Sequence, residues 1–210
     1  MSAESAIGVS RTDAGIIIIH PGWVRVCHWI NALAILVMIG SGWQIYDASP
    51  LFRGLEFSKH IALGQWLGGA LLWHFAAMWV LVVNGIIYVS LGLATGRFRR
   101  KLLPIYPSEV LNDAKAALTF KLAHDDLSHY NAVQKVLYTG VILCGVLIVL
   151  SGLSIWKPVQ FQELTTLFGG YDFARYVHFF AMSAIVGFLA VHVALALLVP
   201  KSLRAMITGR

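Results

Sequence analysis

Two histidines in the last hydrophobic stretch of the chain have a spacing that suits a metal cofactor. His178 and His192 are 14 residues apart in a stretch without Asp, Glu, Lys or Arg. In an α-helix this spacing is within about 40° of whole turns and about 21 Å of axial rise, so both side chains share a face at two depths. Neutral imidazole is a ligand of haem iron, and an electron-carrying haem takes one on each side. One helix therefore offers two ligands, and each needs a partner from another helix.

Three further histidines lie inside or beside hydrophobic stretches: His28, His60 and His74. An ionisable side chain at membrane depth is costly and usually functional. A single one of them is equally well explained as a side chain hydrogen-bonded between helices. Several histidines at two depths favour iron ligation instead.

The elements that must position these histidines are four stretches without charged residues, 26–46, 61–96, 136–156 and 176–200. Only 12% of the residues are charged, about half the fraction of a soluble domain. About 20 apolar residues cross a bilayer core as a helix, and backbone groups in lipid must bond within their own segment. We predict an all-α integral membrane four-helix bundle in one domain, 1–210, with spans at about 26–46, 65–94, 133–156 and 176–199.

The charge distribution predicts how the chain is oriented. The N-terminal tail, the 97–135 loop and the C-terminal tail carry twelve Lys/Arg against six Asp/Glu, while loops 47–60 and 157–175 carry four of each. Basic segments stay in the cytoplasm, so both termini are expected there, in a multi-pass protein of the bacterial inner membrane. The net charge of +6 reflects this topology and does not indicate nucleic-acid binding. In the 97–135 loop, a capped amphipathic helix from Ser108 to Leu122 is predicted, with a plain connector as the alternative.

Depth selects the ligand pairs. The last span enters from the periplasm, so His178 lies toward the periplasm and His192 toward the cytoplasm. His28 begins the first span at the cytoplasmic side and matches His192, whereas His74 follows the periplasmic start of the second span and matches His178. The predicted pairs are His28–His192 and His74–His178.

A rival scheme uses His60, which is also 14 residues before His74. It resembles the cytochrome b of quinol:cytochrome c oxidoreductases and pairs His60 with His178 and His74 with His192, leaving His28 spare. The charged and polar residues directly before His60 favour a place in the loop or headgroup layer. The other three histidines fall in cytoplasmic segments and are expected to be solvated or interfacial: His20, His124 and His129.

Four short motifs occur in order along the chain: Cys27-His28-Trp29, Tyr130-Asn131-Ala132-x-Gln134-Lys135, Ser151-Gly152-Leu153-Ser154-Ile155-Trp156-Lys157-Pro158 and His178-x13-His192. In order and placement they resemble the two-haem cytochrome b subunits of membrane-bound formate dehydrogenase and nickel–iron hydrogenase. Three others are similar to the branch that serves molybdenum oxidoreductases of the thiosulfate-reductase or sulfite-oxidase-like type: Trp73-His74-Phe75, Asn84-Gly85-x-x-Tyr88 and Arg204-Ala205-Met206-Ile207-Thr208-Gly209. The resemblance covers about residues 20–210.

This resemblance implies two b haems ligated by His28, His74, His178 and His192, in agreement with the depth argument. It also implies a quinone site near the cytoplasmic haem, beside the Tyr-Asn-Ala-x-Gln-Lys segment. Two amides of that segment, Asn131 and Gln134, are candidates to bond the quinone oxygens, and helix capping is the alternative.

Two arginines are candidate partners of the haem propionates. Arg25 and Arg175 each precede a predicted ligand by three residues, and this offset places two side chains on one helix face. The alternative is that each marks a positively charged membrane boundary.

The predicted function is electron transfer across the membrane between the quinone pool and a periplasmic oxidoreductase subunit of the molybdenum or hydrogenase type. The chain itself is then an electron-transfer subunit without catalytic residues. A stand-alone quinol oxidase or metal-ion reductase is the alternative, and a haem-free anchor or proton transporter is a third possibility. A reduced-minus-oxidised spectrum separates the haem-free possibility from the other two.

Overall fold

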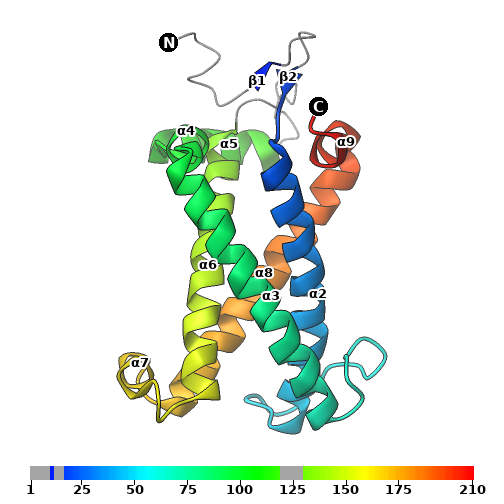
Figure 1. The fold of residues 1–210 in the computed structure, drawn as a ribbon, viewed down its shortest axis with the longest axis vertical. Helices are drawn as coiled ribbons and strands as arrows, with labels where there is room; N and C mark the ends of the chain where they lie inside the picture. Colours follow the sequence, from blue (N-terminus) through cyan, green and yellow to red (C-terminus); the bar gives the residue numbers. More distant parts are fainter. Residues whose placement is uncertain (1–9, 12–16, 119–129) are drawn as a thin grey trace. The chain divides into compact units, whose positions relative to one another are not determined.

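The computed structural model describes residues 10–11, 17–118 and 130–210, and these are mostly helical (Figure 1). Four helices are long and apolar enough to cross a membrane: α2 (Gly22–Ala48), α3 (Leu67–Ala94), α6 (Ala132–Trp156) and α8 (Tyr171–Leu198). They correspond to the four predicted spans, although α8 starts at Tyr171 rather than at residue 176. The predicted all-α membrane fold is confirmed.

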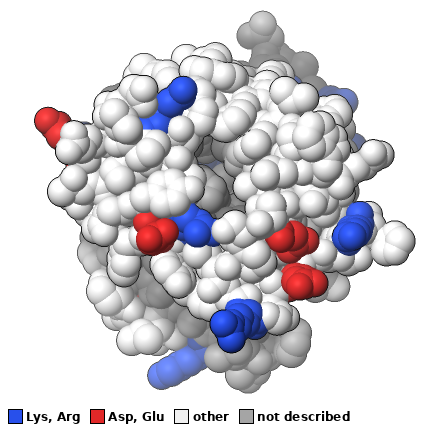
Figure 2. All heavy atoms as spheres, turned by 90° about the horizontal axis from the view of Figure 1, so that it is seen from below, with Lys and Arg blue, Asp and Glu red and all other residues white. Residues whose placement is uncertain are grey.

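The outward surfaces of these helices are apolar. Leu72 on α3 is 74% exposed and Leu198 on α8 is 75% exposed. Water would penalise so many exposed leucines, whereas lipid does not. The space-filling view from below shows a mostly uncharged surface with scattered side chains of both signs (Figure 2).

The described chain divides into two compact units. Residues 26–89 form one, here called the α2–α3 unit. The residues up to 25 and those from 90 onward form the other, here called the α6–α8 unit. Each unit is built on an antiparallel helix pair, which can be followed in Figure 1.

Polar side chains connect the two helices of the α2–α3 unit. The Asn84 amide on α3 donates to the Cys27 carbonyl over 2.8 Å and to Asn31 Oδ1 over 2.7 Å, both on α2. The 49–66 loop closes the other end, where the Phe57 ring stacks on Trp43 with centroids 4.9 Å apart. A buried amide with two partners on the facing helix holds this pair in one register.

Small residues bring together the helices of the α6–α8 unit. Ser151 and Ser154 on α6 are fully buried, and Ala181 on α8 is 4% exposed. Small side chains allow helix backbones to approach closely in a membrane. Between the two helices, α7 (Gln162–Leu167) packs back through Thr165, whose hydroxyl lies 3.4 Å from the Ser154 carbonyl.

Shorter elements accompany the membrane helices of this unit. They are α4 (Arg97–Leu102), α5 (Pro107–Leu118), α9 (Pro200–Thr208) and a pair of two-residue antiparallel strands, β1 (Ser10–Arg11) and β2 (Ile17–Ile18). The helix predicted over Ser108–Leu122 is α5, and Leu122 lies outside the described residues, as do His124 and His129. The elements α4, α7, α9, β1 and β2 were not predicted.

The two ends of the chain are joined by hydrogen bonds. The Gly209 carbonyl accepts from the backbone N–H of Ile19 over 2.8 Å and of His20 over 3.4 Å. The Arg25 guanidinium donates to the Ile207 carbonyl over 2.7 Å. The segment before α2 and the end of α9 therefore form one substructure.

Candidate haem site

The α2–α3 unit presents two histidines at different levels. His28 is the seventh residue of α2, and His74 is the eighth residue of the antiparallel α3. His74 contacts Ser41 on α2, so in the frame of α2 the two histidines are 13 residues apart. That separation corresponds to about 20 Å along the helix.

The α6–α8 unit repeats this arrangement on a single helix. His178 and His192 both lie on α8, and their 14-residue spacing corresponds to about 21 Å along its axis. Each unit thus carries one histidine at each of two levels with nearly the same axial separation. Two stacked cofactors, each ligated from both units, require this spacing.

A serine and a glycine of α2 contact the ring of His74. Ser41 Oγ lies 3.0 Å from His74 Nδ1, and the serine is fully buried. A Cβ added to Gly42 would lie 3.6 Å from His74 Cε1. The missing side chain at Gly42 leaves room for the imidazole to lie against the helix backbone.

The same pair of residue types contacts His178. Ser151 Oγ on α6 lies 3.1 Å from His178 Nδ1, and this serine is also fully buried. A Cβ added to Gly152 would lie 3.2 Å from His178 Cε1, which is closer than at Gly42. A Ser-Gly dipeptide on a neighbouring helix therefore seats one histidine in each unit.

The other two histidines have aromatic neighbours. His28 meets Trp29 edge-on with ring centroids 5.3 Å apart, and His192 stacks on Phe188 at 5.5 Å with an interplanar angle of 12°. Phe188 in turn contacts Tyr138 on α6 at 6.4 Å. These apolar rings are suitable walls for a porphyrin, whose faces and edges are largely hydrocarbon.

His60 lies outside the helices. It is exposed in a turn that precedes α3, and its backbone N–H donates to Ser58 Oγ over 3.4 Å. This position agrees with the loop or headgroup placement expected from sequence and gives no support to the rival scheme that uses His60.

The two arginine candidates differ in their surroundings. Arg25 donates to the Ile207 carbonyl, but its buried Nε has no hydrogen-bond partner among the described residues. A buried donor without a partner is costly, and a propionate oxygen would satisfy it. Arg175 is half-buried near the start of α8. The proposed propionate contacts of both arginines remain predictions.

The two amide candidates, Asn131 and Gln134, form a capping box at the start of α6. Asn131 Oδ1 accepts from the Gln134 backbone N–H over 2.8 Å, and Gln134 Oε1 accepts from the Asn131 backbone N–H over 3.1 Å. The capping alternative is thus present. Only the amide nitrogens of these side chains are left for a quinone oxygen.

A family model described as prokaryotic cytochrome b561 matches residues 19–209. The chain belongs to the prokaryotic cytochrome b561 family. It is therefore a haem-binding, multi-pass membrane protein of electron transport. This confirms the predicted class of protein, including its placement in a membrane and its use of b-type haem.

Two relatives refine the comparison. This cytochrome is 52% identical over 191 residues to an inferred protein-methionine-sulfoxide reductase subunit named YedZ1 from Azospira oryzae, an alignment that covers 91% of this chain and 96% of the relative. It is 23% identical over 207 residues to an inferred B-type cytochrome subunit of Ni/Fe-hydrogenase from Bradyrhizobium diazoefficiens, with 91% of this chain and 82% of the relative covered.

The described residues of this cytochrome fit haem b better than a bare metal ion. No group of three or more His, Cys, Asp or Glu occurs among them, whereas a b haem needs only two imidazoles and a channel with room beside them. The glycines at the His74 and His178 rings and the orphaned Nε of Arg25 are consistent with such a group.

A buried basic cluster, made of His20, Arg97, Lys101 and Tyr130, was missed from the sequence. Arg97 is 7% and Lys101 is 5% exposed. The Arg97 guanidinium lies 3.2 Å from His20 Nδ1, and Lys101 Nζ lies 5.9 Å from the Tyr130 ring centroid. Burial raises the pKa of the Tyr130 hydroxyl, and the Arg97 charge partly opposes this. His20 is buried, so its expected solvated or interfacial place is only partly right.

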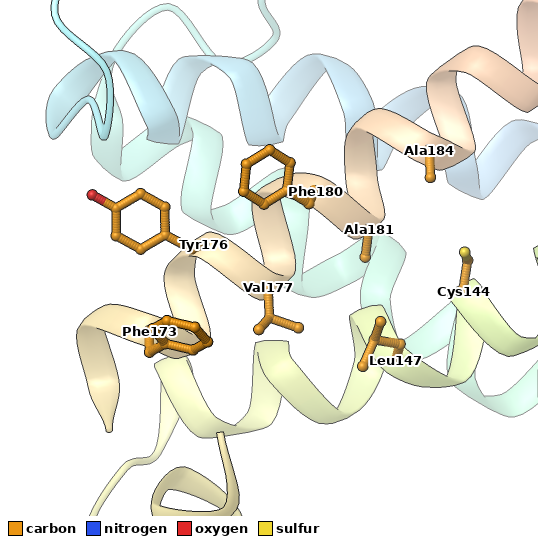
Figure 3. A pocket seen from close by; sticks show the side chains of 8 residues that line it. All are labelled: Cys144, Leu147, Phe173, Tyr176, Val177, Phe180, Ala181 and Ala184. Atoms are coloured by element: carbon orange, nitrogen blue, oxygen red, sulfur yellow. The ribbon is translucent and has the colours of Figure 1, made fainter. Parts of the chain in front are cut away.

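An open apolar groove of about 610 Å³ runs along α6 and α8 (Figure 3). The hydroxyl of Tyr176 points away from the other lining side chains in this view. Because hydrocarbon alone faces the groove, it suits a lipid chain and lacks the polar groups that would orient a quinone ring. Its lining residues are Cys144, Leu147, Phe173, Tyr176, Val177, Phe180, Ala181 and Ala184.

Proposed function

We propose that this cytochrome b561 carries electrons through two b haems from the quinone pool to a periplasmic protein-methionine-sulfoxide reductase. The observation that carries the two-haem part is the matching separation of the histidine levels, about 20 Å along α2 and about 21 Å along α8. One haem would leave half of this arrangement unexplained.

The proposed axial pairs are His28 with His192 for the cytoplasmic haem and His74 with His178 for the periplasmic haem. The haems, when bound, supply one-electron carriers at the two levels. The chain provides the imidazoles, the glycines that admit the ring planes, and apolar walls that keep water from the iron. Arg25 and Arg175 are proposed to neutralise propionates.

The proposed quinol site lies beside the buried basic cluster and the start of α6. A quinol must lose two protons with its two electrons, so its oxygens need nearby hydrogen-bonding groups. The protonated hydroxyl of Tyr130 and the amide nitrogens of Asn131 and Gln134 can bind and orient these oxygens. The positive charges of Arg97 and Lys101 favour the anionic form that follows proton loss.

The partner is inferred from the relative that is 52% identical over nearly its whole length. Reduction of a methionine sulfoxide to a thioether and water takes two electrons and two protons, which is what one quinol releases. The basic segments at the chain ends favour cytoplasmic termini, so the His178 level would face the periplasm and the partner. A molybdenum centre in that partner remains part of the proposal.

The first test is spectroscopic. The purified full-length protein is expected to show a b-type α-band and two haems per chain. His74→Ala should lose one haem, whereas the matched variant His60→Ala should keep both. A chain without an α-band would end the proposal, and loss of haem in His60→Ala alone would replace the ligand set with the rival one.

The second test concerns the partner. Haems reduced with a quinol analogue should reoxidise when a protein-methionine-sulfoxide reductase and a methionine-sulfoxide peptide are both present. Omitting the peptide is the control. Reoxidation that instead requires a hydrogenase would favour the class of the 23% identical relative, and rapid turnover with a soluble acceptor alone would favour the stand-alone enzyme.

A further inference from the structure

Each unit contains a fully buried serine whose hydroxyl hydrogen already has an acceptor. Ser41 Oγ donates to the Val37 carbonyl one helical turn earlier, over 2.6 Å. A hydroxyl has a single hydrogen but two lone pairs. Its contact of 3.0 Å with His74 Nδ1 is then one in which the serine oxygen accepts and the imidazole donates.

The α6–α8 unit shows the same network with different residues. Ser151 Oγ donates to the Leu147 carbonyl over 2.8 Å and lies 3.1 Å from His178 Nδ1. The two histidines are on different helices, α3 and α8, and the two serines are on their respective neighbours α2 and α6. The recurrence in two units that share no residue argues against a chance contact.

The network selects one tautomer of each ring. With the proton held on Nδ1, the lone pair of Nε2 is the one that can ligate iron. A hydrogen bond from the second ring nitrogen also fixes the ring orientation and increases the basicity of the ligating nitrogen. Greater basicity stabilises ferric relative to ferrous iron and lowers the reduction potential of that haem.

From this geometry we infer that Ser41 and Ser151 are positioning residues that hold His74 and His178 as the two axial ligands of one haem. The inference rests on the ligand set given under Proposed function. It adds that the periplasmic haem is tuned from both sides by neutral hydroxyl acceptors in the helix interior.

The chain offers a matched control in Ser154. It lies on the same helix as Ser151, is fully buried as well, and donates to the carbonyl four residues earlier, Leu150, over 3.2 Å. No histidine contact of Ser154 is described. Ser154→Ala therefore reproduces the cavity and the lost back-bond without removing a ligand contact.

The test measures haem content, midpoint potential and the ferric EPR signal in purified full-length variants. Ser41→Ala and Ser151→Ala should each raise the potential of the same haem, changing its reduction equilibrium by about fivefold to tenfold. A tenfold change equals 59 mV for a one-electron couple. Ser154→Ala should leave both potentials unchanged.

If an alanine variant fails to assemble, cysteine at the same position keeps the volume while weakening the hydrogen bond, and Ser151→Cys should show the same direction of shift. Potentials and EPR signals that match those of Ser154→Ala would overturn the positioning role. Shifts on two different haems would overturn the shared haem. Retention of both haems in His178→Ala would instead overturn the ligand set, which is a separate failure.

Discussion

The α2–α3 unit and the α6–α8 unit seat a histidine in the same way but join their helices differently. In both, a Ser-Gly dipeptide meets an imidazole, at Ser41-Gly42 and at Ser151-Gly152. The first pair of helices is connected by the buried amide of Asn84, whereas the second approaches through small side chains. The contacts around the predicted ligands recur, while the means of helix association varies.

This contrast separates what a haem requires from what a helix pair requires. Iron ligation needs one tautomer and space for a ring at a set depth, which leaves few solutions. Two helices in lipid can associate through a polar bond or through close packing with similar success. The difference therefore indicates which residues tolerate exchange between the units and which do not.

The largest expected effect concerns two ligands that lie in different units. His74→Ala and His178→Ala should each halve the haem content. The double variant should lose no more than either single one, because both histidines serve one haem. Pyridine haemochrome assays against protein concentration would measure this. A double variant without any haem would show that the two residues belong to different haems.

Stability should respond differently in the two units. Ala181→Leu would place extra volume at a 4% exposed position that points toward α6 in Figure 3, at a cost of about 1–3 kcal/mol. Asn84→Ala removes two hydrogen bonds across α2 and α3 and should cost about 0.6–1.7 kcal/mol. Thermal unfolding in detergent, followed by circular dichroism, would rank the two. An Asn84 variant of unchanged stability would remove the proposed contrast.

A smaller difference is expected between the two glycines. Gly152→Ala brings a methyl group to 3.2 Å from His178 Cε1, so the ring must shift, whereas the 3.6 Å at Gly42 is ordinary van der Waals contact. Gly152→Ala should alter the EPR signal and potential of the periplasmic haem, and Gly42→Ala should not. Equal responses at the two positions would mean that these rings are not held as tightly as the distances indicate.

The smallest effect is expected at the start of α6. Asn131→Ala removes one half of the capping box and should destabilise the helix by about 1 kcal/mol, with both haem spectra intact. Quinol-dependent haem reduction would then separate two roles. An unchanged rate would assign Asn131 to capping alone, and a markedly lower rate would support its proposed contact with quinol.

The membrane helices could be predicted because lipid excludes charge, and charge-free stretches are visible in any sequence. The two levels of His178 and His192 also followed from helix geometry, since both residues lie on one helix. The serine contacts could not be predicted in this way. Ser41 meets His74 only in one register of α2 against α3, and that register depends on side-chain packing between helices.

The buried basic cluster shows a second limit. The run from Arg97 to Lys101 is typical of a solvated stop at a membrane face, yet both of its end residues are buried. Their burial depends on His20, 77 residues before Arg97, and on Tyr130. Local sequence carries no signal for such distant partners.

The hydrogen bonds that Gly209 accepts from Ile19 and His20 have a consequence for topology experiments. Residues joined by backbone hydrogen bonds cannot lie on opposite sides of a bilayer. Compartment-sensitive reporters fused to the two ends of the chain must therefore agree, whichever way the protein is inserted. The pair of fusions serves as an internal check on the even number of crossings, before either one is used to assign the cytoplasmic face.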